Sequence, residues 1–293
     1  RAAIDYVINE IKSDTGYDLR EVPMKVITTI DKDAQEVLNK LEKGEIYKFP
    51  NDAMQEGIAI TDMTTGGLSA ISGGRNYGAR GTNRATIKRQ PGSTAKILFD
   101  YGPYIEYLNG SPASLFLDEE TTYTNGTPIK NADGKYNGLM TMRDALAASR
   151  NIPALRAFQA VNKENPDYIK TFVKSLGINY GDELYESAAI GGFDGVSPVQ
   201  MSAAYAAYGR GGYYIEPYSY TEVTLLDTGK LYKKQNEKVK VMSEETAYMI
   251  TSILMTAAER GVGGVKVYGT NIAAKSGTTN LDKATTEKLG IPA

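Results

Sequence analysis

The segment Ser93-Thr94-Ala95-Lys96 places a hydroxyl group and an amine three residues apart. If the segment is helical, residues i and i+3 share a face, so the Lys96 amine can reach the Ser93 hydroxyl. A serine at the start of a helix also presents its backbone N–H to a developing oxyanion, and the helix dipole adds to that effect. The spacing therefore indicates a serine nucleophile with a lysine base, on the condition that burial and a second cation lower the pKa of Lys96.

The composition leaves few other designs for a catalytic site. The 293 residues include no His, no Cys and no Trp. The chain therefore has no Ser-His-Asp triad, no thiolate nucleophile and no Cys-ligated metal, and a proton carrier must be Lys, Asp, Glu or Tyr. The formal net charge of −2 argues against nucleic-acid binding, which needs a basic excess or patch. Serine–lysine chemistry is the main option that remains.

Two further segments carry residues suited to the same chemistry. Ser149-Arg150-Asn151 gives a Ser-x-Asn pattern, Lys275-Ser276-Gly277-Thr278-Thr279 gives a Lys-[Ser/Thr]-Gly pattern, and each occurs once. Taken singly, each motif has a plainer explanation: Ser93, Ser149 and Asn151 as helix caps, Lys275 as a lysine that blunts a strand edge, and Gly277 as a bulge. Those explanations do not account for three motifs in this order.

The three ordered motifs resemble the signature of penicillin-binding proteins and serine β-lactamases. Their flanks resemble the transpeptidase domain of class A penicillin-binding proteins, over about residues 25–280. Two departures, Ile97 where Pro is usual and Ser276 where Thr is commoner, leave the reactive groups in place. The flanking segments that carry the resemblance are Asn83-Arg84-Ala85, Arg89-Gln90-Pro91-Gly92, Ala145 to Ala154, Gly191-Gly192, Val196-Ser197-Pro198 and Ala203-Ala204-Tyr205-Ala206-Ala207.

The resemblance implies a role for each residue of the first two motifs. Ser93 is expected to attack the carbonyl of the penultimate D-Ala of a stem peptide, so that the terminal D-Ala leaves. Lys96 is expected to be the base that activates Ser93, and Ser149 to relay the proton to the leaving amine. Asn151 is expected to hold the amide of the donor peptide and to contact Lys96.

The third motif is expected, by the same resemblance, to bind substrate. Lys275 would lower the pKa of the motif base and attract the terminal carboxylate of the substrate, which the hydroxyl groups of Ser276 and Thr278 would bind. Gly277 would let substrate approach the chain. The backbone N–H groups of Ser93 and Thr278 would form the oxyanion hole. No cofactor and no metal is implied.

The implied function is a D,D-transpeptidase that cross-links peptidoglycan stem peptides through a Ser93 acyl-enzyme and is covalently inhibited by β-lactams. A class A β-lactamase needs a deacylating Glu in a Glu-x-x-Leu-Asn segment between the second and third motifs. Glu106-Tyr107-Leu108-Asn109 has the wrong spacing and precedes the second motif. D,D-carboxypeptidase activity stays open, and so does a silent module that senses β-lactams or scaffolds a cell-wall complex, although the intact motifs argue against silence.

The expected partners are the D-Ala-D-Ala donor peptide, an amine acceptor and β-lactam antibiotics, with other cell-wall synthesis proteins as candidates and no nucleic acid. The resemblance also implies a location at the outer face of a bacterial cell membrane.

Helices and antiparallel strands must position these residues, and the pattern predicts an α+β fold with a central antiparallel sheet flanked by helices and a helical subdomain. Asn109 to Leu139 is interpreted as loop-rich. Helices are predicted from Ile4 to before Gly16 and over Asp31 to Leu41, Ser93 to about Leu108, Thr141 to about Val161, Asp167 to Leu176, Ser197 to Gly209 and Ser243 to near Gly261. Strands are predicted over Met24 to Ile30, in hairpins of Gly57 to Asp62 with Leu68 to Ser72 and of Tyr220 to Leu226 with Lys230 to Lys233, and over Asn271 to Gly277.

Two regions are expected along the chain. Residues 1–50 resemble the region that links glycosyltransferase and transpeptidase domains, and residues 51–293 form the transpeptidase domain. In the family two more strands and a helix follow the third motif, so the C-terminal strands are expected to be missing from this chain. The glycosyltransferase domain and the membrane anchor are likewise expected to lie outside it.

Overall fold

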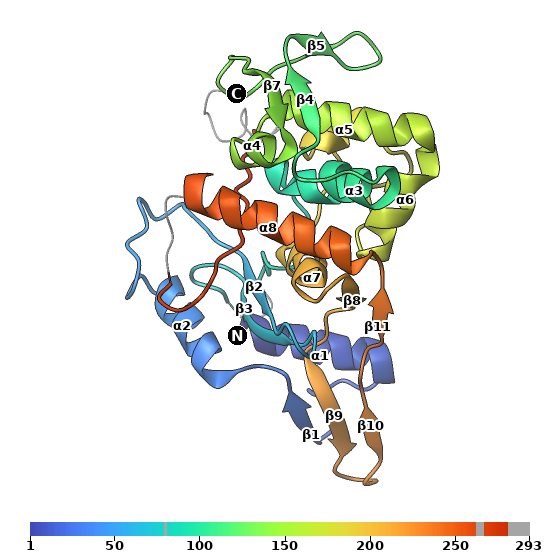
Figure 1. Ribbon diagram of the computed structural model, residues 1–293. Helices are drawn as coiled ribbons and strands as arrows, with labels where there is room; N and C mark the ends of the chain where they lie inside the picture. Colours follow the sequence, from blue (N-terminus) through green and yellow to red (C-terminus); the bar gives the residue numbers. More distant parts are fainter. Residues whose placement is uncertain (79–80, 262–266, 281–293) are drawn as a thin grey trace. The chain divides into compact units, whose positions relative to one another are not determined.

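The computed structural model describes residues 1–78, 81–261 and 267–280. Within those ranges the chain forms eight α-helices and several small antiparallel sheets, so the predicted α+β class is confirmed (Figure 1). Backbone contacts divide the chain into two compact units. The first unit holds residues 1–88, 176–178 and 196–241, and the second holds residues 89–175, 179–195 and 242–293.

The first unit contains a three-stranded antiparallel sheet in the order β1-β9-β10. Val7 and Ile11 of helix α1 pack with Tyr220 and Val223 of the middle strand in a buried cluster. The helix ends where Gly16 takes a left-handed conformation, as the sequence predicts. The elements span Ala2–Thr15 (α1), Met24–Thr28 (β1), Tyr220–Leu225 (β9) and Leu231–Lys233 (β10).

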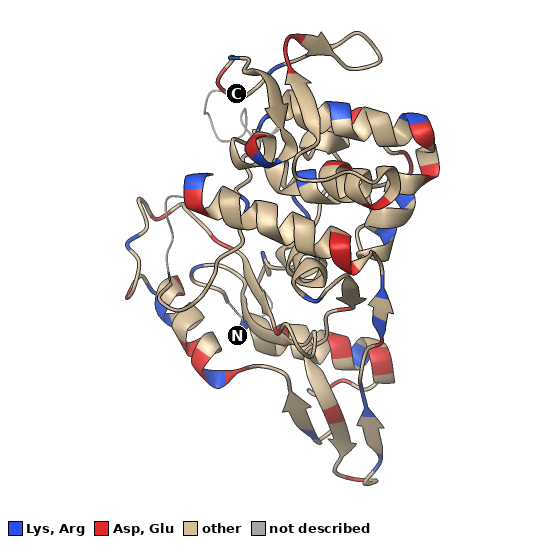
Figure 2. Cartoon of the chain, viewed as in Figure 1, with Lys and Arg blue, Asp and Glu red and all other residues tan. Residues whose placement is uncertain are grey.

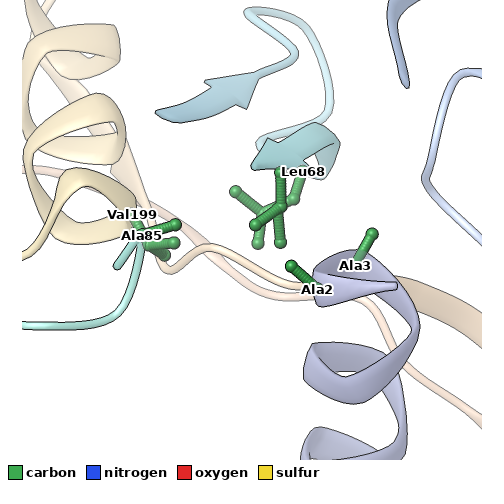
Figure 3. Close-up of a cluster of buried hydrophobic side chains, with 6 residues drawn as sticks. Ala2, Ala3, Leu68, Ala85 and Val199 are labelled. Atoms are coloured by element: carbon green, nitrogen blue, oxygen red, sulfur yellow. The ribbon is translucent and has the colours of Figure 1, made fainter. Parts of the chain in front are cut away.

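The predicted hairpin of the first unit forms from β2 and β3 and carries a second apolar cluster. Leu68 of β3 packs near Ala2, Ala3, Ala85 and Val199 (Figure 3). The remaining elements of this unit are α2 (Lys32–Glu42), β2 (Ile58–Thr61), β3 (Leu68–Ser72), α7 (Pro198–Gly209) and the antiparallel pair of β8 (Tyr213–Ile215) and β11 (Lys238–Lys240).

Two helices of the first unit begin at the residues that the sequence predicts. The Asp31 side chain accepts the N–H of Ala34 at the start of α2. Ser197 and Gln200 form a capping box at the start of α7, where Pro198 occupies the first helical position. Each cap satisfies backbone donors that the helix cannot, which is typically worth about 1 kcal/mol.

The second unit is mainly helical. Within it the helix α5 (Asn151–Glu164) contacts α3 (Gly102–Leu108), α4 (Met142–Ala147), α6 (Pro166–Ser175) and β4 (Leu115–Asp118). The helix predicted from Ser93 forms as three consecutive pieces: a 3₁₀ turn η1 (Gly92–Ala95), a π-helical turn η2 (Ile97–Tyr101) and α3 (Gly102–Leu108). Ser93 therefore lies inside a 3₁₀ turn that Pro91 precedes, and the N-cap interpretation of Ser93 is wrong.

The other described elements of the second unit are four α-helices, one 3₁₀ helix and two antiparallel strand pairs. The helices are α4 (Met142–Ala147), α5 (Asn151–Glu164), α6 (Pro166–Ser175), the 3₁₀ helix η3 (Glu186–Ile190) and α8 (Glu244–Gly261). The antiparallel pairs are β4 (Leu115–Asp118) with β7 (Gly138–Thr141), and β5 (Thr121–Thr122) with β6 (Pro128–Ile129).

Three predictions about strands were wrong. The described segment from Asn271 to Gly277 forms no strand; the Ala274 N–H instead donates to the Leu254 carbonyl of α8 at 3.2 Å. A strand needs a neighbouring strand that bonds to its backbone N–H and C=O groups, and this segment has none among the described residues. The predicted central sheet is also absent from the described residues, whose strands form separate two- and three-stranded sheets.

The segment interpreted as loop-rich, Asn109 to Leu139, contains β4, β5, β6 and the start of β7. These strands are short and lie among glycines and asparagines, so the sequence pattern does not indicate them.

The surface charge is mixed. Figure 2 shows both signs on α1, α2 and α5, in keeping with the near balance of acidic and basic residues. Among the described residues, no helix combines the length and the apolar character that a membrane span requires.

Candidate active site

Lys96 is the buried centre of the site. It is 0% exposed and directly follows the 3₁₀ turn that carries Ser93. Its Nζ donates to the backbone carbonyl of Ser149 at 2.7 Å and to Oδ1 of Asn151 at 2.8 Å. One amine thus joins the first two motifs, which lie more than fifty residues apart along the chain.

Ser149 links Lys96 to the third motif. The Nζ of Lys275 donates to Ser149 Oγ at 2.8 Å and to the backbone carbonyl of Ser276 at 2.9 Å. Ser149 has φ of 55°, in the left-handed region that residues with a Cβ rarely adopt. In this conformation its carbonyl accepts from one lysine and its hydroxyl from the other, so the serine lies between the two amines.

Burial and like charge lower the pKa of both lysines. Desolvation, and then the positive charge of Lys275, lowers the pKa of Lys96 to about 7; Asp100 opposes this shift and Arg150 adds to it. Desolvation lowers the pKa of Lys275 to about 8. An amine with a pKa of about 7 is substantially unprotonated at neutral pH, so it can accept a proton. The burial and the second cation that the sequence argument required are both present.

Close backbone contacts bring the third motif against the turn that carries Ser93. Gly92 has φ of 56°, and a Cβ there would lie 2.3 Å from the Thr278 carbonyl oxygen and 2.8 Å from its nitrogen. A Cβ on Gly277 would lie 2.2 Å from the Pro91 carbonyl oxygen. Side chains are therefore excluded at both glycines. Gly277, which was expected to make room for substrate, here lets its own chain approach Pro91.

A cavity of about 250 Å³ opens beside Ser149 and Lys275. Its apolar wall consists of alanine methyl groups. Its second cation is Arg260, whose Nη1 lies 2.8 Å from Asp144 Oδ1. Because the charge of Arg260 is paired with Asp144, Lys275 supplies the positive charge that the cavity offers an anionic group next to the motif residues. The lining residues are Ala147, Ala148, Ser149, Ala257, Arg260, Gly261, Lys275 and Ser276.

The structure brings the predicted site residues together to different degrees. Four of them share one hydrogen-bonded cluster: Lys96, Ser149, Asn151 and Lys275. The others adjoin this cluster through the backbone, and Ser276, Gly277 and Thr278 are exposed while Ser93 is partly buried.

Sequence reasoning missed two charged groups near this cluster. Arg150, inside the second motif, is buried and paired with Asp118 at 2.8 Å. Asp100, one helical turn after Lys96, is fully buried. The place of Arg150 inside a motif and that of Asp100 one turn after Lys96 could have indicated both residues. However, Arg and Asp side chains are usually exposed to solvent, so residue type alone favours an exposed position for both.

The motifs in this cluster belong to a recognisable domain. Residues 57–290 match the family described as the penicillin binding protein transpeptidase domain. The chain belongs to this family. The match covers most of the chain and confirms the resemblance seen in the three motifs.

Curated relatives give the same assignment. Penicillin-binding protein 1A/1B of Bacillus subtilis (strain 168) is 41% identical over 296 residues, which cover 99% of this chain and 32% of the relative. Penicillin-binding protein 1A of Streptococcus pneumoniae R6 is 34% identical over 288 residues, which cover 94% of this chain and 40% of the relative. The chain therefore spans about a third to two fifths of the length of these two penicillin-binding proteins.

Solved structures of penicillin-binding proteins share the fold. The structure of PonA1 from Mycobacterium tuberculosis in complex with penicillin V superposes with a TM-score of 0.83, over 96% of this chain and 77% of that chain, at 21% identity. Penicillin-binding protein A from M. tuberculosis, solved as a ceftriaxone acyl-enzyme complex, gives a TM-score of 0.73 over 94% of this chain, at 16% identity.

Removal of the Lys275 charge is expected to raise the pKa of Lys96. Lys275 is the largest charge contribution that lowers this pKa, so Lys275→Met should move it upward from about 7. NMR titration of isotope-labelled lysine side chains measures the shift. Lys163→Met, an exposed position in the last turn of α5, is the control. An unchanged or lower pKa of Lys96 in Lys275→Met would contradict the electrostatic explanation.

Proposed function

We propose that this domain is a D,D-transpeptidase that cross-links peptidoglycan stem peptides through an ester on Ser93. The observation that carries the proposal is the buried Lys96, whose pKa is lowered to about 7 and which lies three residues from Ser93. The membership of the chain in the transpeptidase family supports it.

In the proposed acylation, Ser93 Oγ attacks the carbonyl carbon of the penultimate D-Ala. Its proton passes to the Lys96 amine, and backbone N–H groups of Ser93 and Thr278 stabilise the oxyanion. Ser149, whose hydroxyl accepts from Lys275 Nζ, relays the proton to the nitrogen of the terminal D-Ala as the peptide bond breaks. The products are the Ser93 ester and free D-Ala.

In the second half-reaction an acceptor amine attacks the ester carbonyl, a new amide forms, and Ser93 regains its proton. The carboxylate of the donor would be bound by the Lys275 charge and by the hydroxyl groups of Ser276, which lines the cavity, and Thr278; both residues are exposed. Asn151, whose Oδ1 accepts from Lys96, would orient the donor amide with its Nδ2 group.

A β-lactam would acylate the same serine, because its strained amide offers an equivalent carbonyl. Relatives with this fold were solved with penicillin V and as a ceftriaxone acyl-enzyme, which supports the proposal. The chain spans a minor part of the length of its curated relatives. The same proposal therefore includes an adjoining glycosyltransferase domain, a membrane anchor and a location at the outer face of the cell membrane. It also includes the role of residues 1–50 as a linker between the two domains.

Covalent labelling by a fluorescent penicillin tests the nucleophile. We expect one adduct on the wild-type protein and none on Ser93→Ala, with Ser13→Ala as the control because Ser13 is exposed on α1. Mass spectrometry of a peptic digest should place the adduct on the peptide that contains Ser93. A folded wild-type protein without an adduct, or an adduct that persists in Ser93→Ala, would refute the proposal.

The fate of the acyl-enzyme separates transpeptidation from D,D-carboxypeptidase activity. With a D-Ala-D-Ala stem peptide and an added amine, a transpeptidase yields the cross-linked amide, whereas a carboxypeptidase yields only the hydrolysed peptide. We expect the amide, and hydrolysis alone would support the carboxypeptidase alternative.

A further inference from the structure

The segment that joins α4 to α5 has an unfavourable backbone and still makes two contacts with Lys96. Ser149, in the middle of this segment, has φ of 55°, in the left-handed region that is unfavourable for a residue with a Cβ. The Ser149 carbonyl and the Asn151 side chain both accept from the Lys96 amine. The surrounding structure must therefore hold this segment in place, and Arg150 lies between the two contacting residues.

Arg150 is bound through all three guanidinium nitrogens. Its Nε donates to Asp118 Oδ2 at 2.8 Å, its Nη1 to Asp133 Oδ2 at 2.9 Å, and its Nη2 to the Lys135 carbonyl. Arg150 is 5% exposed, and Asp118, at the end of β4, is 0% exposed. A buried guanidinium with three directed donors is fixed in position and orientation, which a lysine ammonium would not match.

Asp118 extends the network to the other side of the segment. Asn131 Nδ2 donates to Asp118 Oδ1 at 2.7 Å, and Asn131 Oδ1 accepts the backbone N–H of Asn151 at 2.7 Å. The N-cap residue of α5, Arg150, makes no side-chain cap of its own. Asn131 therefore takes up the first backbone donor of α5 from a different part of the chain.

We propose that Arg150, Asp118 and Asn131 are positioning residues for the acylation step, which hold the Ser149 carbonyl and the Asn151 side chain against Lys96. The inference rests on the proposed function, since it assumes that Lys96 is the base. The three residues do not touch the reacting atoms. They act by keeping the acceptors of the Lys96 amine at 2.7 and 2.8 Å.

The charge of Arg150 adds a second effect that a purely structural role would not have. The groups whose charges act on Lys96 are Lys275 and Arg150, which lower its pKa, and Asp100, which raises it when it is ionised. Loss of the guanidinium raises the pKa of Lys96, so a smaller fraction of the amine is unprotonated at neutral pH. The pH at which acylation reaches half of its maximum should then move upward.

The test is the second-order rate constant of acylation by a fluorescent penicillin from pH 6 to pH 9. We expect Arg150→Gln to lower this constant by about 10- to 100-fold at pH 7, because the acceptors of the Lys96 amine are displaced. We also expect the rise of the rate constant with pH, its rising limb, to shift to higher pH. Asn131→Ala keeps the guanidinium, so we expect a lower rate with no shift of the limb. Arg156→Ala is the control, because Arg156 lies on the same helix and pairs with the exposed Glu119 at 3.1 Å.

The outcomes distinguish the inference from the function on which it rests. The inference is overturned, while the proposed function stands, if both variants are acylated at the rate of Arg156→Ala and their acylation rates rise over the same pH range as that of the wild type. A wild-type protein that forms no adduct overturns both. Circular dichroism establishes that each variant folds. Should Arg150→Gln fail to fold, the rate of Asn131→Ala decides, because that variant removes one uncharged side chain and keeps the buried ion pair.

Discussion

Replacement of Lys96 by alanine is expected to slow acylation by a penicillin by about 10²- to 10⁴-fold, the range typical for loss of a general base. Lys96 has a pKa lowered to about 7, as a base at neutral pH needs, and the sequence places it three residues from Ser93. Lys96→Arg should lose as much activity as Lys96→Ala, because arginine keeps the positive charge and does not give up its proton in proteins.

The wild-type pH profile provides a test that needs no variant. If unprotonated Lys96 accepts the proton of Ser93, the acylation rate should rise with pH through about 7. If protonated Lys275 supports substrate binding, the rate should fall again above about 8. The resulting bell is narrow and lies well below the ordinary lysine pKa of about 10.4. A rate that is flat between pH 6 and pH 9 would contradict the role of both lysines.

Thermal unfolding must accompany these measurements, since Lys96 is fully buried and its hydrogen bonds join two segments. Lys163→Ala on α5 serves as the control lysine because Lys163 is exposed and is not among the charges that shift the pKa of Lys96. If Lys96→Arg folds and is acylated at the wild-type rate, Lys96 is a structural cation and another group must be the base.

The structure brings four residues selected from the sequence into one hydrogen-bonded cluster: Lys96, Ser149, Asn151 and Lys275. Residue type, local spacing and the order of the motifs indicated them, and their catalytic roles, with that of Ser93, stay predictions. Helix ends such as Gly16 and Ser197 were predictable for the same reason, since a cap depends on a few adjacent residues.

Features that depend on distant partners were not predictable. The strand expected at Asn271 to Gly277 requires a neighbouring strand, and in the described residues the segment has none. The burial of Arg150 depends on its acceptors Asp118, Asp133 and the Lys135 carbonyl, which come from β4 and from the segment between β6 and β7. The residues next to Arg150 in the sequence do not indicate those acceptors, because they are brought in by tertiary packing.

Substitution of Asp100 by asparagine is expected to flatten the dependence of stability on pH. Asp100 is 0% exposed, and neither carboxylate oxygen has a hydrogen-bond partner within the described residues. Burial raises the pKa of Asp100 well above its usual range, and the nearby charge of Lys96 only partly offsets this effect. The folded protein therefore holds a proton that the unfolded chain releases above its ordinary pKa of about 3.9.

The sign of the effect follows from that proton. Stability is greatest below the unfolded pKa of Asp100 and decreases as the pH rises toward its raised folded pKa, by roughly 1.4 kcal/mol per pH unit between the two values. Asparagine is neutral at every pH, so Asp100→Asn should lose this slope and become more stable relative to the wild type as the pH rises. Asp182→Asn, at an exposed position, should keep the wild-type slope.

Urea unfolding at pH 5, 6 and 7 measures the three slopes, and the comparison between variants removes the contributions of all other titrating groups. The amide of Asp100→Asn would be as poorly hydrogen-bonded as the protonated acid that it replaces. The protonation of Asp100 is therefore tested by how stability changes with pH, and not by the stability at one pH. If Asp100→Asn and the wild type lose stability in parallel from pH 5 to pH 7, Asp100 is ionised in the folded protein. Its charge would then pair with that of Lys96, and the acylation limb expected near pH 7 should move to lower pH in Asp100→Asn.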